Sequence, residues 1–367
     1  MPPDLLQLLL KPLTEATAAL CRLDERIARS SVGAGVLERQ NFADACASLW
    51  LDGELVHIED FVLHDAGQDV RAPTHELTIA RDVLRSRRRI ASQPPAWALS
   101  PDGLRTLRRA PAGPGPGPSL GDDGGSGPDE IDGEPPGGGE GESVGDASEL
   151  DSEFAAIDAV LARSNAAIEQ ARRPGRAGAG GRDADTKALV YDLDWDEDAR
   201  LEEWRDVLRQ AQDLPALLQA IVALDAWNEL SVLQHAPWLG RLLCASIVRE
   251  AGITTGAHLA AINLGLKTIP VDRLAIAQGL LAAAELGLKE HDRLALARTV
   301  MERKVSGRRT SSRLPDLIEL VMAKPLVSAG MMAETLGVTQ QAARRIVVEL
   351  GLREMTGRGR FRAWGIM

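Results

Sequence analysis

The chain has 367 residues, a length that suits two or three domains, and it carries a formal net charge of −11. Its three cysteines form no Cys-x-x-Cys pair, so neither a disulfide framework nor a cysteine-based metal site is expected. The first residues lack the basic start and apolar core of a signal peptide, and no apolar run reaches membrane-spanning length. These features, with abundant Ala and Leu, predict a mainly α-helical, cytoplasmic protein with buried free thiols at Cys21, Cys46 and Cys244.

The charge is distributed unevenly along this acidic chain. From Met301 to the end there are 12 Lys and Arg residues against 6 Asp and Glu residues. A basic end on an acidic protein predicts one positively charged docking face, because the acidic parts would repel nucleic acid elsewhere.

The first hundred residues predict an N-terminal helical domain, 1–100. Apolar residues recur at helical spacing over 4–29, where Pro12 is expected to kink or divide the helix. A second helix is expected over 36–51. A turn and a shorter helix are expected over 54–64. Another helix is expected to begin after Thr74, whose hydroxyl suits an N-cap.

The composition changes abruptly after this domain. Residues 110–153 include twelve acidic side chains and no Lys or Arg, with many Gly and Pro residues. Such a stretch cannot bury enough apolar surface to offset the entropy of ordering, so 110–150 is predicted to be a disordered acidic linker. A helical core is expected over 151–303, with helices at 204–211 and 214–233 among others.

One part of the N-terminal domain resembles a known family. Ser48 is followed by three residues, Asp52 and Gly53, and then by Ile58-Glu59-Asp60. This pattern resembles the inhibitory helix of Fic/Doc proteins, in which Ser or Thr precedes Glu and Gly or Asn at the same spacing. The resemblance implies that the acidic residue pairs with an arginine of the catalytic loop and blocks nucleotide binding, although Asp is one methylene shorter than Glu. The alternative is that Ser48 and Asp52 only close a helix.

A second segment resembles the ends of the Fic motif. His235, Pro237 and Trp238 precede Gly240 and Arg241, as His-Pro-Phe precedes the Gly-Arg-Leu-Leu helix of that family. The family's acidic residue and Gly-Asn-Gly loop are missing between them, so no metal or nucleotide phosphate has its expected ligands. His235 and Arg241 are therefore interpreted as relicts of a catalytic site. Alternatively, His235 caps a helix end and Arg241 pairs with an acidic neighbour.

The last segment, 314–367, is predicted to fold as a winged helix-turn-helix domain. Ser328 suits the N-cap of a first short helix, Gly337 its C-cap, and Thr339 the N-cap of a second helix. A helix over 315–323, before these two, would be the third helix of the domain. The order of small and branched apolar residues around the turn resembles that of helix-turn-helix domains.

The second helix would be the recognition helix, because its outward face carries Gln and Arg side chains that pair with bases in the major groove. Strands over 352–356 and 361–364 would form a basic wing, suited to phosphate or minor-groove contact. The predicted DNA-binding residues are Thr339, Gln340, Gln341, Arg344, Arg345, Arg358, Arg360 and Arg362. The alternative is a small helical domain that binds protein or caps a larger fold.

Taken together, the chain resembles an uncharacterised bacterial family with a degenerate Fic-like helical bundle and a C-terminal winged helix-turn-helix. The predicted function is transcriptional regulation through double-stranded DNA, with homodimerisation as a possibility. The alternatives are a Fic-type AMP transferase with a remodelled site and a protein-interaction module. We expect no cofactor, no metal and no membrane partner.

Overall fold

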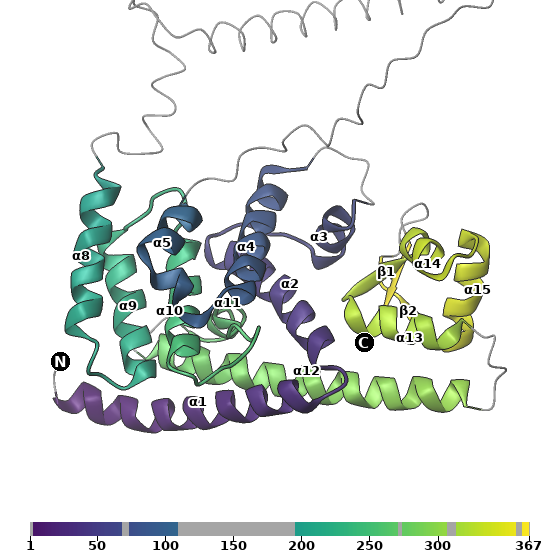
Figure 1. Ribbon diagram of the computed structural model, residues 1–367, viewed down its shortest axis with the longest axis horizontal. Coiled ribbons are helices and arrows are strands. Elements are labelled where there is room, and N and C mark those ends of the chain that lie inside the picture. Colours follow the sequence, from purple (N-terminus) through teal and green to yellow (C-terminus); the bar gives the residue numbers. More distant parts are fainter. Residues whose placement is uncertain are drawn as a thin grey trace, which may run out of the picture. The chain divides into compact units, whose positions relative to one another are not determined.

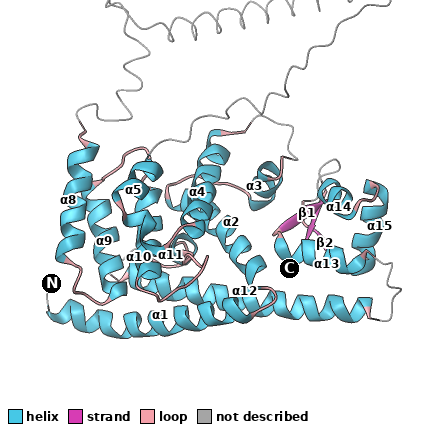
Figure 2. Ribbon diagram, viewed as in Figure 1, coloured by secondary structure: helices cyan, strands magenta, loops and turns pink. Residues whose placement is uncertain are grey.

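The computed structural model describes residues 3–67, 73–108, 195–270, 274–306, 313–356 and 362–366, and the side chains from residue 7 onward. In this part of the chain the protein is mainly α-helical (Figures 1 and 2). The predicted linker 110–150 lies outside the described residues. None of the described helices is both long enough and apolar enough to cross a membrane.

The N-terminal block is built from helices and one short 3-10 turn. Its elements are α1 (Pro3–Arg29), α2 (Gly33–Leu51), α3 (Ile58–Asp65), α4 (His75–Ser92), η1 (Pro95–Leu99) and α5 (Pro101–Arg108). Pro12 does not divide α1, which runs as one helix. The Thr74 hydroxyl accepts a hydrogen bond from the Leu77 amide at 3.4 Å, as predicted for the cap of α4.

A second set of helices follows the undescribed segment. These are α8 (Glu197–Gln210), α9 (Ala216–Leu230), α10 (Trp238–Glu250), α11 (Ile262–Leu266) and α12 (Ala275–Val305). The predicted helix 214–233 is shorter than expected at both ends. It begins after Pro215 and ends before Ser231, which adopts a left-handed conformation with φ 46°.

The two sets of helices share one hydrophobic core. α1 packs along α12, and α2 packs against both α4 and α11 (Figure 1). The core includes Phe42 and Phe61 of the N-terminal block, and Trp204 and Trp227 of the second set. The Trp204 and Trp227 rings meet edge to face with centroids 5.3 Å apart, and both are almost fully buried. We call this combined structure the helical body.

The prediction of three buried thiols is wrong for Cys21, which is exposed. Cys21 lies on α1 beside the buried positions Leu20 and Leu23, and a step of one residue turns a helix by about 100° away from its buried face. Cys244 is buried and Cys46 is partly buried, and burial raises the pKa of both thiols to about 12. Only Cys21 is therefore in the surroundings of an ordinary surface thiol.

The C-terminal domain combines three helices with a small antiparallel sheet. Its elements are α13 (Leu314–Ala323), β1 (Leu326–Ser328), α14 (Ala329–Leu336), α15 (Gln340–Leu350), β2 (Arg353–Glu354) and β3 (Ala363–Gly365). The strand order is β1-β3-β2. Trp364 of the central strand β3 pairs with Val327 of β1 on one side and with Glu354 of β2 on the other. The sequence predicted the helices and the two wing strands, but not β1.

Candidate nucleic-acid interface

The turn between α14 and α15 is fixed by local hydrogen bonds. The Ser328 hydroxyl accepts from the Met331 amide at 3.1 Å, and the Thr339 hydroxyl accepts from the Ala342 amide at 3.2 Å. Gly337 has φ 62°, a left-handed conformation that is costly for other residues. Both N-caps and the C-cap lie where the sequence predicted them.

One face of each helix of the pair is buried. Met332 and Leu336 of α14 and Ala343 and Val347 of α15 belong to a buried hydrophobic cluster that the C-terminal domain shares with the helical body. Because these positions repeat at helical spacing, the opposite face of α15 is left at the surface.

That outward face carries the predicted base-reading residues. Gln340, Gln341, Arg344 and Arg345 are all exposed, as is the capping residue Thr339. Neither Arg344 nor Arg345 has a hydrogen bond or ion pair with any residue that the structure describes. Their guanidinium groups are therefore available to an external partner.

The wing is described only in part. Arg358 and Arg360 lie outside the described residues. Arg362 is described, and it forms an ion pair with Glu354 while its guanidinium lies 5.6 Å from the centre of the Trp364 ring. This ion pair is at the surface, where such pairs contribute little, so a phosphate could replace Glu354 as the partner of Arg362.

The C-terminal domain is held to the helical body by a shared hydrophobic cluster, which joins Val36 and Leu294 to Leu317. Hydrogen bonds to its backbone carbonyls add to this contact. Arg39 of α2 donates to the carbonyls of Val321 at 2.9 Å and Lys324 at 2.6 Å, at the end of α13. Arg293 donates to the Ile366 carbonyl at 2.7 Å, and Lys304 donates to the Leu350 carbonyl at 3.0 Å. Sequence patterns could not predict these contacts, since each joins residues far apart in the chain.

A second cluster surrounds Arg241 of α10. Its Nη2 donates to the Asp52 carboxylate at 2.7 Å and to the Ser48 hydroxyl at 3.0 Å, and its Nε donates to the Asn263 side chain at 2.5 Å. The shorter Asp52 side chain therefore reaches Arg241. Gly53 follows with φ 88° and ends the helix. Asn263 was missed, because nothing in its spacing sets it apart.

His235 does not join this cluster through any contact among the described residues. Its Nδ1 lies 3.0 Å from the Glu197 carboxylate, at the first turn of α8. Both side chains are about one-third exposed. His235 and Arg241, which the sequence suggested as remnants of one site, thus have separate partners. The described residues hold no group of three or more His, Cys, Asp or Glu side chains that could bind a metal.

The chain resembles known proteins over nearly its whole length. Residues 189–306 match a family described as "Protein of unknown function (DUF1612)", and residues 314–367 match a family described as "HTH DNA binding domain". The "Uncharacterized protein y4cF" of Sinorhizobium fredii is 69% identical in an alignment of 381 residues, which covers 98% of this chain and 97% of that protein. The second match confirms the helix-turn-helix, and it identifies the domain as a DNA-binding one.

Proposed function

Because this chain belongs to the family of the Sinorhizobium fredii protein y4cF and ends in a helix-turn-helix DNA-binding domain, we propose that it is a transcriptional regulator acting on double-stranded DNA. The helical body would position that domain and provide for dimerisation. Such a protein would act in the cytoplasm.

The observation that carries this proposal is the exposed face of α15, on which Arg344 and Arg345 have no ion pair with any described residue. Arg344 and Arg345 are suited to guanine, and Gln340 and Gln341 to adenine, when the helix lies in the major groove. Their position in the first half of the helix agrees with the docking of recognition helices, whose N-terminal residues contact base edges. Phosphate contacts are expected from Arg362 and the other wing arginines.

Replacing both recognition-helix arginines should abolish tight DNA binding. Each bidentate contact is worth about 1–3 kcal/mol, so the Arg344→Ala/Arg345→Ala variant should bind its site about 10²-fold or more weakly. Fluorescence anisotropy with labelled fragments of the source genome, at two salt concentrations, measures this loss. The wild-type affinity should also fall steeply with added salt.

The matched control is Arg105→Ala/Arg209→Ala, which removes the same charge from two exposed side chains of the helical body. This control should bind DNA within about twofold of the wild type, since long-range charge is screened at physiological salt. Equal weakening of both variants would mean that only net charge matters. No binding by the wild type would favour a protein-interaction module instead.

One observation favours a second candidate function, a Fic-type AMP transferase. Ser48 and Asp52 bind Arg241, the same kind of contact that the resemblance to the Fic inhibitory helix implies. Against it, the five residues between His235 and Arg241 include no acidic side chain and no asparagine. This segment therefore has no metal ligand and no phosphate-binding loop at the place where Fic proteins have them.

We expect no transfer of AMP, even after the Asp52–Arg241 contact is removed. Wild-type protein and the Asp52→Ala variant would be incubated with ATP labelled on the α-phosphate and Mg²⁺, and labelled protein would be measured. If only the Asp52→Ala variant becomes labelled, the protein is an AMP transferase, because removing Asp52 would then have released an inhibitory contact. A variant with both Asp52→Ala and His235→Ala provides the control for a histidine-dependent reaction.

A further inference from the structure

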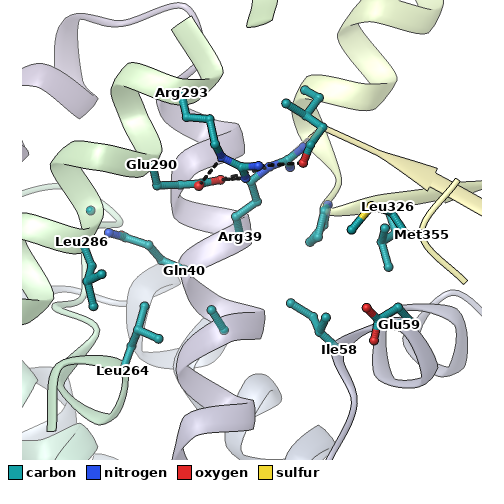
Figure 3. Close-up of a pocket in the computed structure, with 14 residues that line it drawn as sticks. Arg39, Gln40, Ile58, Glu59, Leu264, Leu286, Glu290, Arg293, Leu326 and Met355 are labelled. Carbon is teal, nitrogen blue, oxygen red and sulfur yellow. Dashed lines mark hydrogen bonds and ion pairs between the residues drawn. The ribbon is translucent and has the colours of Figure 1, made fainter. Parts of the chain in front are cut away.

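A cavity of about 510 Å³ lies between the helical body and the C-terminal domain (Figure 3). This volume is within the range of small-molecule sites. Its lining is mainly apolar, with a charged group along one edge. The lining residues on which the ligand would rest include Gln40, Ala43, Ile58, Leu286, Leu326 and Met355.

Gln40 places an unsatisfied polar group in this lining. Its side chain is only 4% exposed, and its Oε1 has no hydrogen-bond partner within the described part of the chain. A buried amide oxygen without a partner is destabilising, so such groups call for an explanation. Gly287 leaves the amide its space, since a Cβ there would lie 2.4 Å from the Gln40 Nε2.

The charged side chains of the lining balance one another. Glu290 binds Arg293 at 2.7 Å and lies 3.4 Å from Arg39, and the lining also includes Glu59, so two arginines are matched by two glutamates. A charged ligand would have to lose its water and disrupt this balance. The lining therefore favours a neutral ligand.

We propose that the cavity binds a neutral, mainly apolar small molecule that carries an amide-like group, with an N–H beside a carbonyl. The Gln40 Oε1 is closed to solvent in this structure, so the amide would turn toward the cavity when the ligand binds. The ligand N–H would then donate to the Oε1, and the ligand carbonyl would accept from the Nε2, since a primary amide both accepts and donates. The rest of the ligand would lie against Ile58, Leu286 and Met355, which point into the same space in Figure 3.

The site is also linked to the position of the DNA-binding domain. Leu326 and Met355 belong to that domain, whereas Gln40 and Leu286 belong to the helical body. A ligand that contacts both the helical body and the C-terminal domain stabilises the packing of these two parts seen here, in which the outward face of α15 is exposed. This linkage rests on the proposed function. It predicts that the ligand raises the protein's affinity for DNA, and that DNA raises the protein's affinity for the ligand by the same factor.

The probe is isoquinolin-1(2H)-one, a neutral bicyclic lactam, beside its N-methyl derivative, which has no N–H to donate. Saturation-transfer NMR titrations on the full chain, without DNA, should show saturable binding of the lactam and at least tenfold weaker binding of the N-methyl compound. The Gln40→Leu variant should lose this preference, while the cavity-filling Ala43→Phe variant should lose binding altogether. Leu296→Ala, at a 67% exposed side chain outside the cavity, should bind like the wild type.

Circular dichroism melting curves would confirm that each variant is folded before it is compared. Absence of saturable binding by the wild type, equal binding of the two compounds, or undiminished binding by Ala43→Phe would overturn the site. The DNA affinity is measured separately with and without the lactam. If the lactam binds but the DNA affinity does not change, the linkage is wrong and the site stands. If the lactam binds but the protein binds no DNA at all, the site stands and the proposed function is wrong.

Discussion

Replacing Asp44 by alanine should lower the free energy of unfolding by about 3–5 kcal/mol, the usual cost of leaving a buried charge without its partner. Asp44 and Arg87 are 0% and 1% exposed, and their side chains meet at 2.5 Å. The Asp44 carboxylate also accepts from the Asn263 side chain at 2.7 Å and from the Leu264 amide at 3.0 Å. The variant would therefore leave several buried donors unsatisfied.

Burial lowers the pKa of Arg87, and Asp44 opposes that shift by attracting the charge. Without Asp44 the guanidinium would have to stay charged in an apolar core or lose its proton, and both are unfavourable. Because Asn263 also binds Arg241, the loss should loosen the Arg241 cluster as well.

Urea unfolding followed by circular dichroism measures this effect. The matched control is Asp102→Ala, which removes one side of the Arg105–Asp102 pair, whose side chains are 67% and 82% exposed. Exposed pairs contribute about 0–1 kcal/mol, so this control should unfold almost like the wild type. A similar small change in both variants would contradict the assignment of Asp44 as the centre of a buried network.

Replacing Arg39 by alanine should loosen the contact of the C-terminal domain with the helical body at a cost of about 2–5 kcal/mol, because one buried and one partly buried carbonyl lose their donor. The shared hydrophobic cluster should keep the domain attached. The last carbonyls of any helix have no partner within the helix, and Arg39 provides one for the end of α13. Burial lowers the pKa of Arg39 to about 10, with Glu290 opposing the shift, so the side chain is still protonated at neutral pH. The positive charge strengthens both hydrogen bonds.

Hydrogen exchange followed by mass spectrometry separates this local effect from a general loss of stability. In Arg39→Ala, peptides from 314–350 should exchange faster while peptides from α9 and α10 keep their protection. Gly35→Ala should act in the same way, since its Cβ would lie 2.0 Å from the Met322 carbonyl oxygen. Arg26→Ala, which removes an exposed ion pair between α1 and α12, is the control and should change neither region. Uniformly faster exchange in Arg39→Ala would contradict a docking role.

The sequence predicted the helix-turn-helix well because that motif is fixed by local rules. Ser328, Gly337 and Thr339 each act on backbone groups within four residues, so their positions can be identified without knowing the fold. β1 was missed since three residues are too few to show alternation, and its pairing partner β3 is far along the chain.

The contacts between the helical body and the C-terminal domain could not be predicted in this way. Arg39 and Lys324 are 285 positions apart, and no periodicity reports on such a pair. The contact of Asp52 with Arg241 spans 189 positions, and only the resemblance to the Fic inhibitory helix gave a reason to expect it. The cavity around Gln40 is built from both parts of the chain, so it becomes visible only after they have packed together.

Selection from genomic fragments is the sharpest test of whether α15 reads DNA sequence. Purified protein and its Arg344→Ala/Arg345→Ala variant would be incubated with sheared DNA of the source genome at physiological salt, and the retained fragments sequenced. We expect the wild type to enrich a small set of fragments with a shared motif, and the variant to enrich none. Uniform recovery of fragments by both proteins, or the same enriched set for both, would contradict it.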